Sequence, residues 1–154
     1  MARGTYSGPE DCNCLAVRQA ARHITQFYDQ LLAPSGLRTT QFSILAKLRR
    51  LGPKTINALA AEMVMDRTTL GRNILPLERD GLVIVEQGSR DRRSKELRVT
   101  EAGEARFRAG MKGWAKAQRQ FEKAFGAERT ADMRILLHAV AATRLGTHAA
   151  SAEK

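Results

Sequence analysis

Apolar residues recur at steps of three and four along most of the chain, which is the period of an amphipathic α-helix. The first such stretch begins at Asp11 and stops at Pro34-Ser35-Gly36, a tripeptide that interrupts helices. Its apolar face consists of Leu15, Ala20, Ala21, Ile24, Phe27, Tyr28, Leu31 and Leu32. The pattern therefore predicts one long helix near the start of the chain.

Three shorter helices are predicted next, and each opens at a residue that commonly caps helices: Thr39, Thr55 and Asp66. Their inward-facing residues are Phe42, Leu45 and Leu48, then Ile56, Leu59 and Met63, then Leu70, Ile74 and Leu77. Gly81 ends the last of these helices. Pro76 lies inside it and removes a backbone hydrogen bond, so we expect a bend just before Pro76.

The apolar period then changes from helical to alternating. Residues 82–86 are rich in β-branched side chains, residues 88–94 are polar, and residues 97–99 alternate again. This pattern predicts a β-hairpin with a long basic tip. Two further helices are expected at about residues 101–125, capped by Thr100, and at about residues 128–145.

These elements predict a mainly α-helical fold with a small β-hairpin. A short helix, a tight turn, a capped second helix and a basic hairpin make a winged helix-turn-helix, which we assign to residues 37–100. Residues 11–36 and 101–147 form a helical region that we expect to mediate dimerisation. Residues 1–10 are expected to form a flexible arm, and residues 146–154 a frayed end.

The charge of the chain indicates a polyanionic partner. Lys and Arg number 26 against 16 Asp and Glu, which gives a net charge of +10. Between Arg38 and Arg98 there are 13 basic and 7 acidic residues, and 19 of all 26 basic residues are Arg, which bonds bidentately to phosphate and guanine. Because the basic residues gather on the helix-turn-helix and hairpin rather than along one amphipathic helix, DNA is favoured over a membrane surface.

The second helix of a helix-turn-helix can place its first turns against base edges in the major groove. Here those turns carry polar residues that the apolar face does not use: Arg67, Thr68, Thr69, Arg72 and Asn73. The hairpin tip adds Arg90, Arg92 and Arg93, which suit a narrow minor groove. We expect Asp91 to hold a neighbouring Arg side chain by a charge-assisted hydrogen bond. These residues predict binding to double-stranded DNA.

Other function classes have less support in the sequence. It contains no Gly-rich phosphate loop, no nucleophile-and-base arrangement and no paired carboxylates on one face, so no enzyme and no cofactor are predicted. No apolar stretch follows Arg3 and no apolar run is long enough to span a membrane, which predicts a cytoplasmic protein.

From about Asp11 to Leu145 the sequence resembles the MarR family of bacterial transcription regulators. The resemblance rests on Ile56-Asn57-Ala58-Leu59-Ala60, Asp66-Arg67-Thr68-Thr69-Leu70, Leu77-Glu78-Arg79-Asp80-Gly81-Leu82-Val83 and Asp91-Arg92-Arg93-Ser94, followed by Leu97, Thr100 and Gly103. It implies a homodimer in which the first, fifth and sixth helices intertwine, recognition residues at Arg67 through Asn73, and wing residues at Asp91 and Arg93. Pro76 departs from the family's commonest recognition-helix pattern.

The resemblance also implies a repressor that leaves a pseudo-palindromic operator when it binds a small aromatic molecule or when a thiol is oxidised. The effector would lie between the first, second and fifth helices, as expected for an aromatic acid or its thioester. Candidate apolar residues there are Tyr28, Phe42, Phe107, Met111 and Trp114, and candidate partners for a carboxylate are Arg18, Arg22 and His23.

Cys12 and Cys14 have three interpretations. Cys14 could be a small buried hydrophobic residue. By resemblance to the organic-hydroperoxide-sensing branch of the family, Cys14 would instead be a redox-active thiol, with Tyr28 at one of the two tyrosine positions that bond the sulfur and Thr39 at the other. Finally, the two cysteines could bind a metal or metalloid, although a complete ligand set is not evident and no metal site is assigned.

Overall fold

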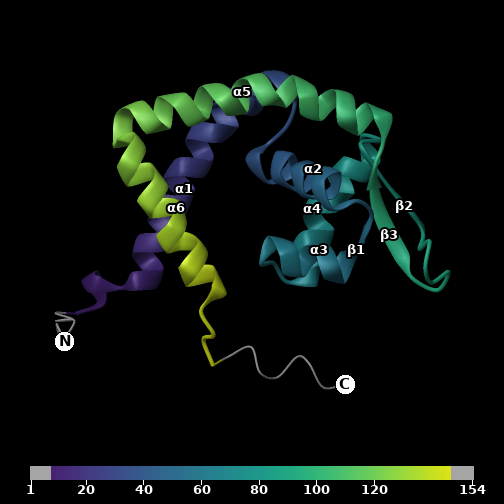
Figure 1. Ribbon diagram of the computed structural model, residues 1–154, viewed down its shortest axis with the longest axis horizontal. Helices are drawn as coiled ribbons and strands as arrows, with labels where there is room; N and C mark the ends of the chain where they lie inside the picture. Colours follow the sequence, from purple (N-terminus) through teal and green to yellow (C-terminus); the bar gives the residue numbers. More distant parts are fainter. Residues whose placement is uncertain (1–7, 147–154) are drawn as a thin grey trace. The chain divides into compact units, whose positions relative to one another are not determined.

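The computed structural model describes residues 8–146, and the expectations for residues 1–7 and 147–154 lie outside the described residues. The chain is mainly helical with one small antiparallel sheet (Figure 1). Contacts divide it into two compact units, Met1–Ala117 and Gln118–Lys154. Within the described residues no helix has both the length and the apolar character needed to cross a membrane.

The first unit contains nearly all of the elements. In chain order these are the 3-10 turn Pro9–Asp11, α1 (Asn13–Leu32), a second 3-10 turn (Ala33–Ser35), α2 (Thr39–Leu51), β1 (Lys54–Thr55), α3 (Ile56–Met63), α4 (Arg67–Arg79), β2 (Val83–Gln87), β3 (Lys95–Val99) and the first part of α5 (Glu101–Phe125). The second unit holds the end of α5 and α6 (Ala127–Ala142).

The predicted fold class is confirmed, with one strand added. β2 and β3 form the expected hairpin, in the register Val83 opposite Val99 and Gln87 opposite Lys95. The short strand β1 pairs with the other edge of β3, so the sheet order is β1-β3-β2. Two residues are too few to give an alternating pattern, which is why the sequence did not reveal β1. α6 also ends three residues before the expected Leu145.

One apolar core joins α2, α3 and α4 to the sheet. Of the nine inward-facing residues expected on these helices, seven are buried and the other two, Ile56 and Met63, are partly buried against the core. Full burial of a Leu or Ile side chain contributes about 1.5–3 kcal/mol. The core also includes Leu32, Leu37, Ile44, Ala60, Leu82, Val83, Leu97 and Phe107.

Helix α4 begins at a side-chain cap. Asp66 Oδ1 accepts the backbone N–H of Thr69 at 2.8 Å, and Asp66 Oδ2 accepts the Thr69 hydroxyl at 2.6 Å. The helix continues through Pro76 because Ile74 and Leu77, on either side of it, are both buried. The preceding turn contains Val64, whose φ of 52° is left-handed and unusual for a β-branched residue.

The end of α4, the wing and α5 are tied together at one junction. The Thr100 hydroxyl donates to the Gly81 carbonyl at 2.6 Å, and the Thr100 backbone N–H donates to the Leu82 carbonyl at 3.1 Å. The same hydroxyl accepts the N–H of Gly103 at 3.0 Å and so caps α5, as predicted. A Cβ on Gly103 would overlap the Leu82 carbonyl oxygen, so only glycine permits this close approach.

The Asp66 cap predicts a pH dependence of stability. The two hydrogen bonds from Thr69, of which the side-chain bond has the larger effect, hold the pKa of Asp66 below its ordinary value of 3.8. The charged form is therefore favoured by folding, and its contribution is present above that ordinary value and lost as the pH falls through the lowered one. At pH 7 we expect Asp66→Ala to lower Tm by about 2–4 °C.

This difference in Tm should shrink between pH 5 and pH 2, because the wild-type carboxylate becomes protonated. Thermal unfolding of both proteins across that pH range measures it. Asp132→Ala, at an exposed Asp of α6, is the control. A difference in Tm that stayed constant down to pH 2 would contradict the role of the charged cap.

Candidate nucleic-acid interface and ligand cavity

The five predicted recognition residues of α4 differ in whether their side chains already have hydrogen-bond partners within the protein. Arg67, Thr68 and Arg72 are exposed, and their side chains bond to no other described residue. Thr69 belongs to the Asp66 cap, and Asn73 Nδ2 donates to the Thr69 carbonyl at 2.9 Å. The side chains of the first three residues are unpaired among the described residues, whereas Thr69 and Asn73 already make hydrogen bonds within the helix and stay predicted DNA contacts.

Leu75 is a residue of this surface that the sequence analysis missed. It is 63% exposed and lies close to Thr68 and Arg72 on the surface of α4, opposite the buried face. The signal was available, since Leu75 falls outside the spacing of Leu70, Ile74 and Leu77. An exposed leucine beside two polar side chains gives this face an apolar contact point.

The wing tip is a compact turn that leaves three arginines in solvent. The N–H of Gly88 donates to the Ser94 carbonyl at 2.9 Å, and a Cβ on Gly88 would overlap Ser94 Oγ. Asp91 Oδ1 accepts the backbone N–H of Arg93 at 2.9 Å. Asp91 thus holds the backbone of the turn and not an arginine side chain, contrary to the sequence prediction. The guanidinium groups of Arg90, Arg92 and Arg93 remain exposed.

A bidentate ion pair stiffens the body of the wing. Arg98 Nε and Nη2 donate to the two carboxylate oxygens of Glu86 at 2.9 and 2.7 Å, from β3 to β2. The Arg98 hydrogen bonds lower the pKa of Glu86, so this carboxylate stays charged. Arg98 is therefore engaged within the protein, unlike the arginines at the tip.

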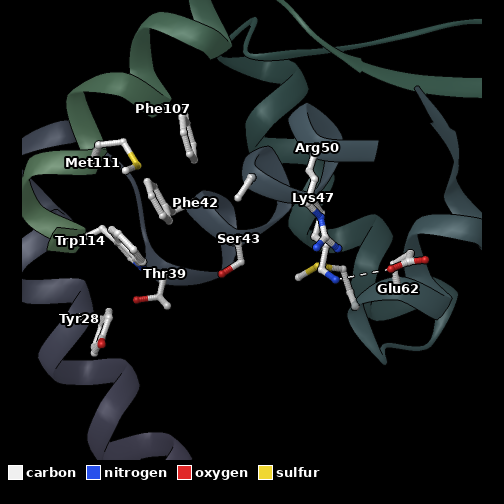
Figure 2. A pocket seen from close by; sticks show the side chains of 12 residues that line it. Tyr28, Thr39, Phe42, Ser43, Lys47, Arg50, Glu62, Phe107, Met111 and Trp114 are labelled. Carbon is white, nitrogen blue, oxygen red and sulfur yellow. Dashed lines mark hydrogen bonds and ion pairs between the residues drawn. The ribbon is translucent and has the colours of Figure 1, made fainter. Parts of the chain in front are cut away.

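A cavity of about 690 Å³ opens in the first unit, and its walls come from α1, α2, α3 and α5 (Figure 2). Such a volume is typical of small-molecule sites. One wall is aromatic: the rings of Phe42 and Phe107 stack with centroids 4.7 Å apart, and Trp114 stacks on Phe42 at 6.3 Å. The lining residues are Tyr28, Thr39, Phe42, Ser43, Ala46, Lys47, Arg50, Glu62, Met63, Phe107, Met111 and Trp114.

The opposite side of the cavity is charged. Lys47 Nζ lies 3.5 Å from Glu62 Oε2, which links α2 to α3 (Figure 2). Arg50, one turn after Lys47, is exposed and has no ion pair with another described residue. Arg49 is different, because it pairs with Glu104 at 2.6 Å and stacks over the Phe107 ring at 4.1 Å.

The structure thus places the five apolar candidates, Tyr28, Phe42, Phe107, Met111 and Trp114, around one cavity. The three predicted cationic candidates, Arg18, Arg22 and His23, lie exposed on α1 and are not part of its lining. The cationic residues in the lining are instead Lys47 and Arg50, both from α2. The sequence analysis included the second helix among the walls but looked for the cationic residues on the first helix, and so it missed these two.

Both thiols lie exposed at the start of α1. Cys12 precedes the helix and its sulfur accepts the N–H of Leu15 at 3.4 Å, while Cys14 lies in the first turn. Cys14 is therefore not a buried hydrophobic residue within this chain. Tyr28 is 14 residues further along the same helix, about 21 Å at 1.5 Å per residue, so it cannot bond Cys14 of its own chain.

No metal site accompanies the two cysteines in the described part of the chain. Among residues 8–146, no group of three or more His, Cys, Asp and Glu side chains is arranged to hold a metal ion.

Known proteins that resemble this chain are transcription regulators with the same winged helix-turn-helix fold. Residues 37–95, from before α2 to the start of β3, match the model of the MarR family. The transcriptional regulator MosR of M. tuberculosis, solved in complex with DNA, is 38% identical, with 88% of this chain and 100% of that chain covered and a TM-score of 0.74. The HTH-type regulator YwoH of Bacillus subtilis (strain 168) is 33% identical over 91 residues, which span 59% of this chain and 66% of YwoH.

More distant regulators share the fold. CouR of Rhodococcus jostii RHA1, solved with p-coumaroyl-CoA, is 20% identical and has a TM-score of 0.74, with 91% of this chain and 99% of that chain covered. These relatives are transcription regulators. The family match, the full-length similarity to MosR and the winged lobe lead to one conclusion: this chain belongs to the MarR family of transcription regulators.

Proposed function

We propose that this protein binds double-stranded DNA in a sequence-specific manner and represses transcription. The observation that carries the proposal is the set of exposed side chains on α4 and the wing that bond to no described residue: Arg67, Thr68, Arg72, Arg90, Arg92 and Arg93. Elsewhere in the same lobe, Arg49 and Arg98 are paired with carboxylates. The DNA complex of MosR, 38% identical, supports the proposal.

The two surfaces have different tasks in this proposal. Arg72, in the second turn of α4, reaches a base edge in the major groove, where a guanidinium can bond bidentately to guanine. Arg93 and its neighbours at the wing tip neutralise phosphates or enter the minor groove. Asp91 has an indirect role, since its carboxylate holds the turn from which Arg93 extends.

The active form in this proposal is a homodimer built from residues 11–36 and 101–147, with residues 37–100 as the DNA-binding lobe. In α6, large apolar side chains are exposed, with Ile135 66% and Leu136 65% accessible, and Leu15 and Val17 are exposed on α1. Exposed apolar clusters of this kind indicate a protein interface. A two-fold dimer presents two α4 helices to a pseudo-palindromic operator.

The cavity is the proposed effector site, and its chemistry suits an aromatic carboxylate or its thioester. The Trp114–Phe42–Phe107 stack can hold a planar ring, while Lys47 and Arg50 can bind an anion. An anion that takes Lys47 competes with Glu62 on α3. Ligand binding would therefore weaken a link between α2 and the first helix of the helix-turn-helix, and so favour a geometry that binds DNA less well.

A thiol switch is the second candidate, and the exposure of both cysteines favours it over a structural role. In this alternative the Cys14 thiolate attacks an organic hydroperoxide, takes one oxygen atom to become a sulfenic acid, and releases an alcohol once a proton is added. In this alternative Tyr28 of the same chain does not bond the sulfur, and Tyr28 of the second protomer would take that place. Metal or metalloid binding by Cys12 and Cys14 remains a further alternative.

The DNA-binding proposal is tested on a duplex selected from a random library by the wild-type protein. We expect Arg72→Ala to relax base preference and to lose about tenfold in affinity. We expect Arg93→Ala to weaken all duplexes alike and to lower the salt slope by about one. Fluorescence anisotropy at several salt concentrations measures both effects. Arg119→Ala, at an exposed Arg of α5, is the control, and unchanged binding by Arg72→Ala would contradict this placement of α4.

The cavity offers an internal probe, because Trp114 is the single tryptophan of the chain and lies in the lining. Titration with p-coumarate, 4-hydroxybenzoate and p-coumaroyl-CoA should change its fluorescence and release DNA. Lys47→Ala and Arg50→Ala should each weaken the binding of the effective ligand about tenfold, and Glu62→Gln should strengthen it by freeing Lys47. Lys112→Ala, outside the lining, is the control. A ligand that releases DNA without any change in Trp114 fluorescence would exclude this cavity.

The thiol alternative predicts a reversible effect of oxidant. Cumene hydroperoxide should abolish DNA binding by the reduced protein, and a thiol reductant should restore it. Cys14→Ser should keep DNA binding in the presence of the oxidant, with Cys12→Ser as the matched variant and mass spectrometry to locate the added oxygen. Binding that ignores the oxidant would rule out this alternative and leave the cavity as the effector site.

A further inference from the structure

Four glycines occupy the interiors of helices in the described part of the chain, and three of them have a steric reason. A Cβ on Gly103 would overlap the Leu82 carbonyl, and one on Gly113 would overlap the Leu31 carbonyl. A Cβ on Gly110 would lie 3.0 Å from the Phe42 ring. At Gly103 and Gly113 the backbone of a neighbouring element leaves no room for a Cβ, and at Gly110 the Phe42 ring would have to shift by a few tenths of an ångström to admit one.

Gly71, the fourth, has no such reason. It lies in the second turn of α4, and its φ is not among the positive values. A Cβ there would meet only Ile56 Cδ1, at 3.9 Å, which is ordinary van der Waals contact. Alanine would therefore fit the folded chain, and it is the better helix former. Position 71 is therefore glycine although alanine would make α4 more stable.

The position of Gly71 suggests what the missing side chain makes room for. Gly71 is partly exposed, and its neighbours on the surface of α4 are Arg67, Thr68 and Leu75, all of them exposed. It lies on the side of α4 that borders α3, because Ile56 is the first residue of α3. In a helix-turn-helix, the first helix crosses the DNA backbone while the second enters the groove.

We propose that Gly71 is the point at which a DNA strand passes closest to α4, with the sugar–phosphate backbone in van der Waals contact with the helix main chain. This inference rests on the proposed DNA-binding function and adds a positioning residue to it. Arg67, one turn earlier, supplies the positive charge beside the phosphates. The absence of a Cβ at Gly71 leaves room for the strand to reach the helix main chain at this point.

The proposal predicts opposite effects of one substitution on stability and on binding. Gly71→Ala should raise Tm by about 2–4 °C and weaken DNA binding about tenfold. Gly71→Val should weaken binding further, since it adds bulk at the same point. The loss should be the same factor for the selected duplex and for a scrambled duplex at low salt, because a backbone contact carries no sequence information. Ala105→Val, on an exposed position of α5, is the control for added bulk.

Three results would contradict the proposed contact at Gly71. A Gly71→Ala protein that binds DNA within twofold of wild type, or that melts at a lower temperature, would overturn the inference while the DNA-binding proposal stands. A loss confined to the selected duplex would place a base, and not the backbone, over Gly71, and would also overturn it. A wild-type protein that binds no duplex at any salt concentration would refute the DNA-binding proposal itself, and this inference with it.

Discussion

The contact between Gly103 and the Leu82 carbonyl fixes the lobe, because three elements depend on it. Leu82 follows directly on the end of α4, and Thr100 joins β3 to α5 while bonding both Gly81 and Leu82. The wing is therefore anchored to α4 at its first residues and to α5 at its last. Neither the arginines of the wing tip nor those of α4 would hold a constant spacing without this close approach of backbone to backbone.

Arginine has two separate uses in the lobe. Arg49 and Arg98 make short carboxylate bonds, which join α2 to α5 and β3 to β2. Exposed ion pairs of this kind contribute little to stability, so their value is in orientation. Arg67, Arg72 and Arg93 have no such partner among the described residues and lie on the outer surfaces of α4 and the wing. The distribution of paired and unpaired arginines separates the scaffold of the lobe from its contact surface.

The cavity and the core share a wall. Phe42 and Phe107 belong to the buried cluster that supports α2 and α3, and the same rings line the cavity. Since close-packed interiors transmit small displacements, a molecule that pushes on this stack also acts on the helix-turn-helix. The Lys47–Glu62 pair provides a second connection, between the charged side of the cavity and α3. In the proposed function these contacts of α2 with α3 and α5 would couple effector binding to DNA binding.

The sequence by itself determined the local features of this protein. Helix caps at Asp66 and Thr100, the buried faces of α2 to α4 and the hairpin all follow from neighbours within a few residues, where period and capping chemistry suffice. The tertiary structure decided what depends on distant partners. Strand β1 exists only because β3 offers it an edge, Asp91 bonds a backbone N–H and not a guanidinium, and Lys47 and Arg50 line the cavity because α2 packs between α1, α3 and α5. Such contacts join residues far apart along the chain, and no local pattern encodes them.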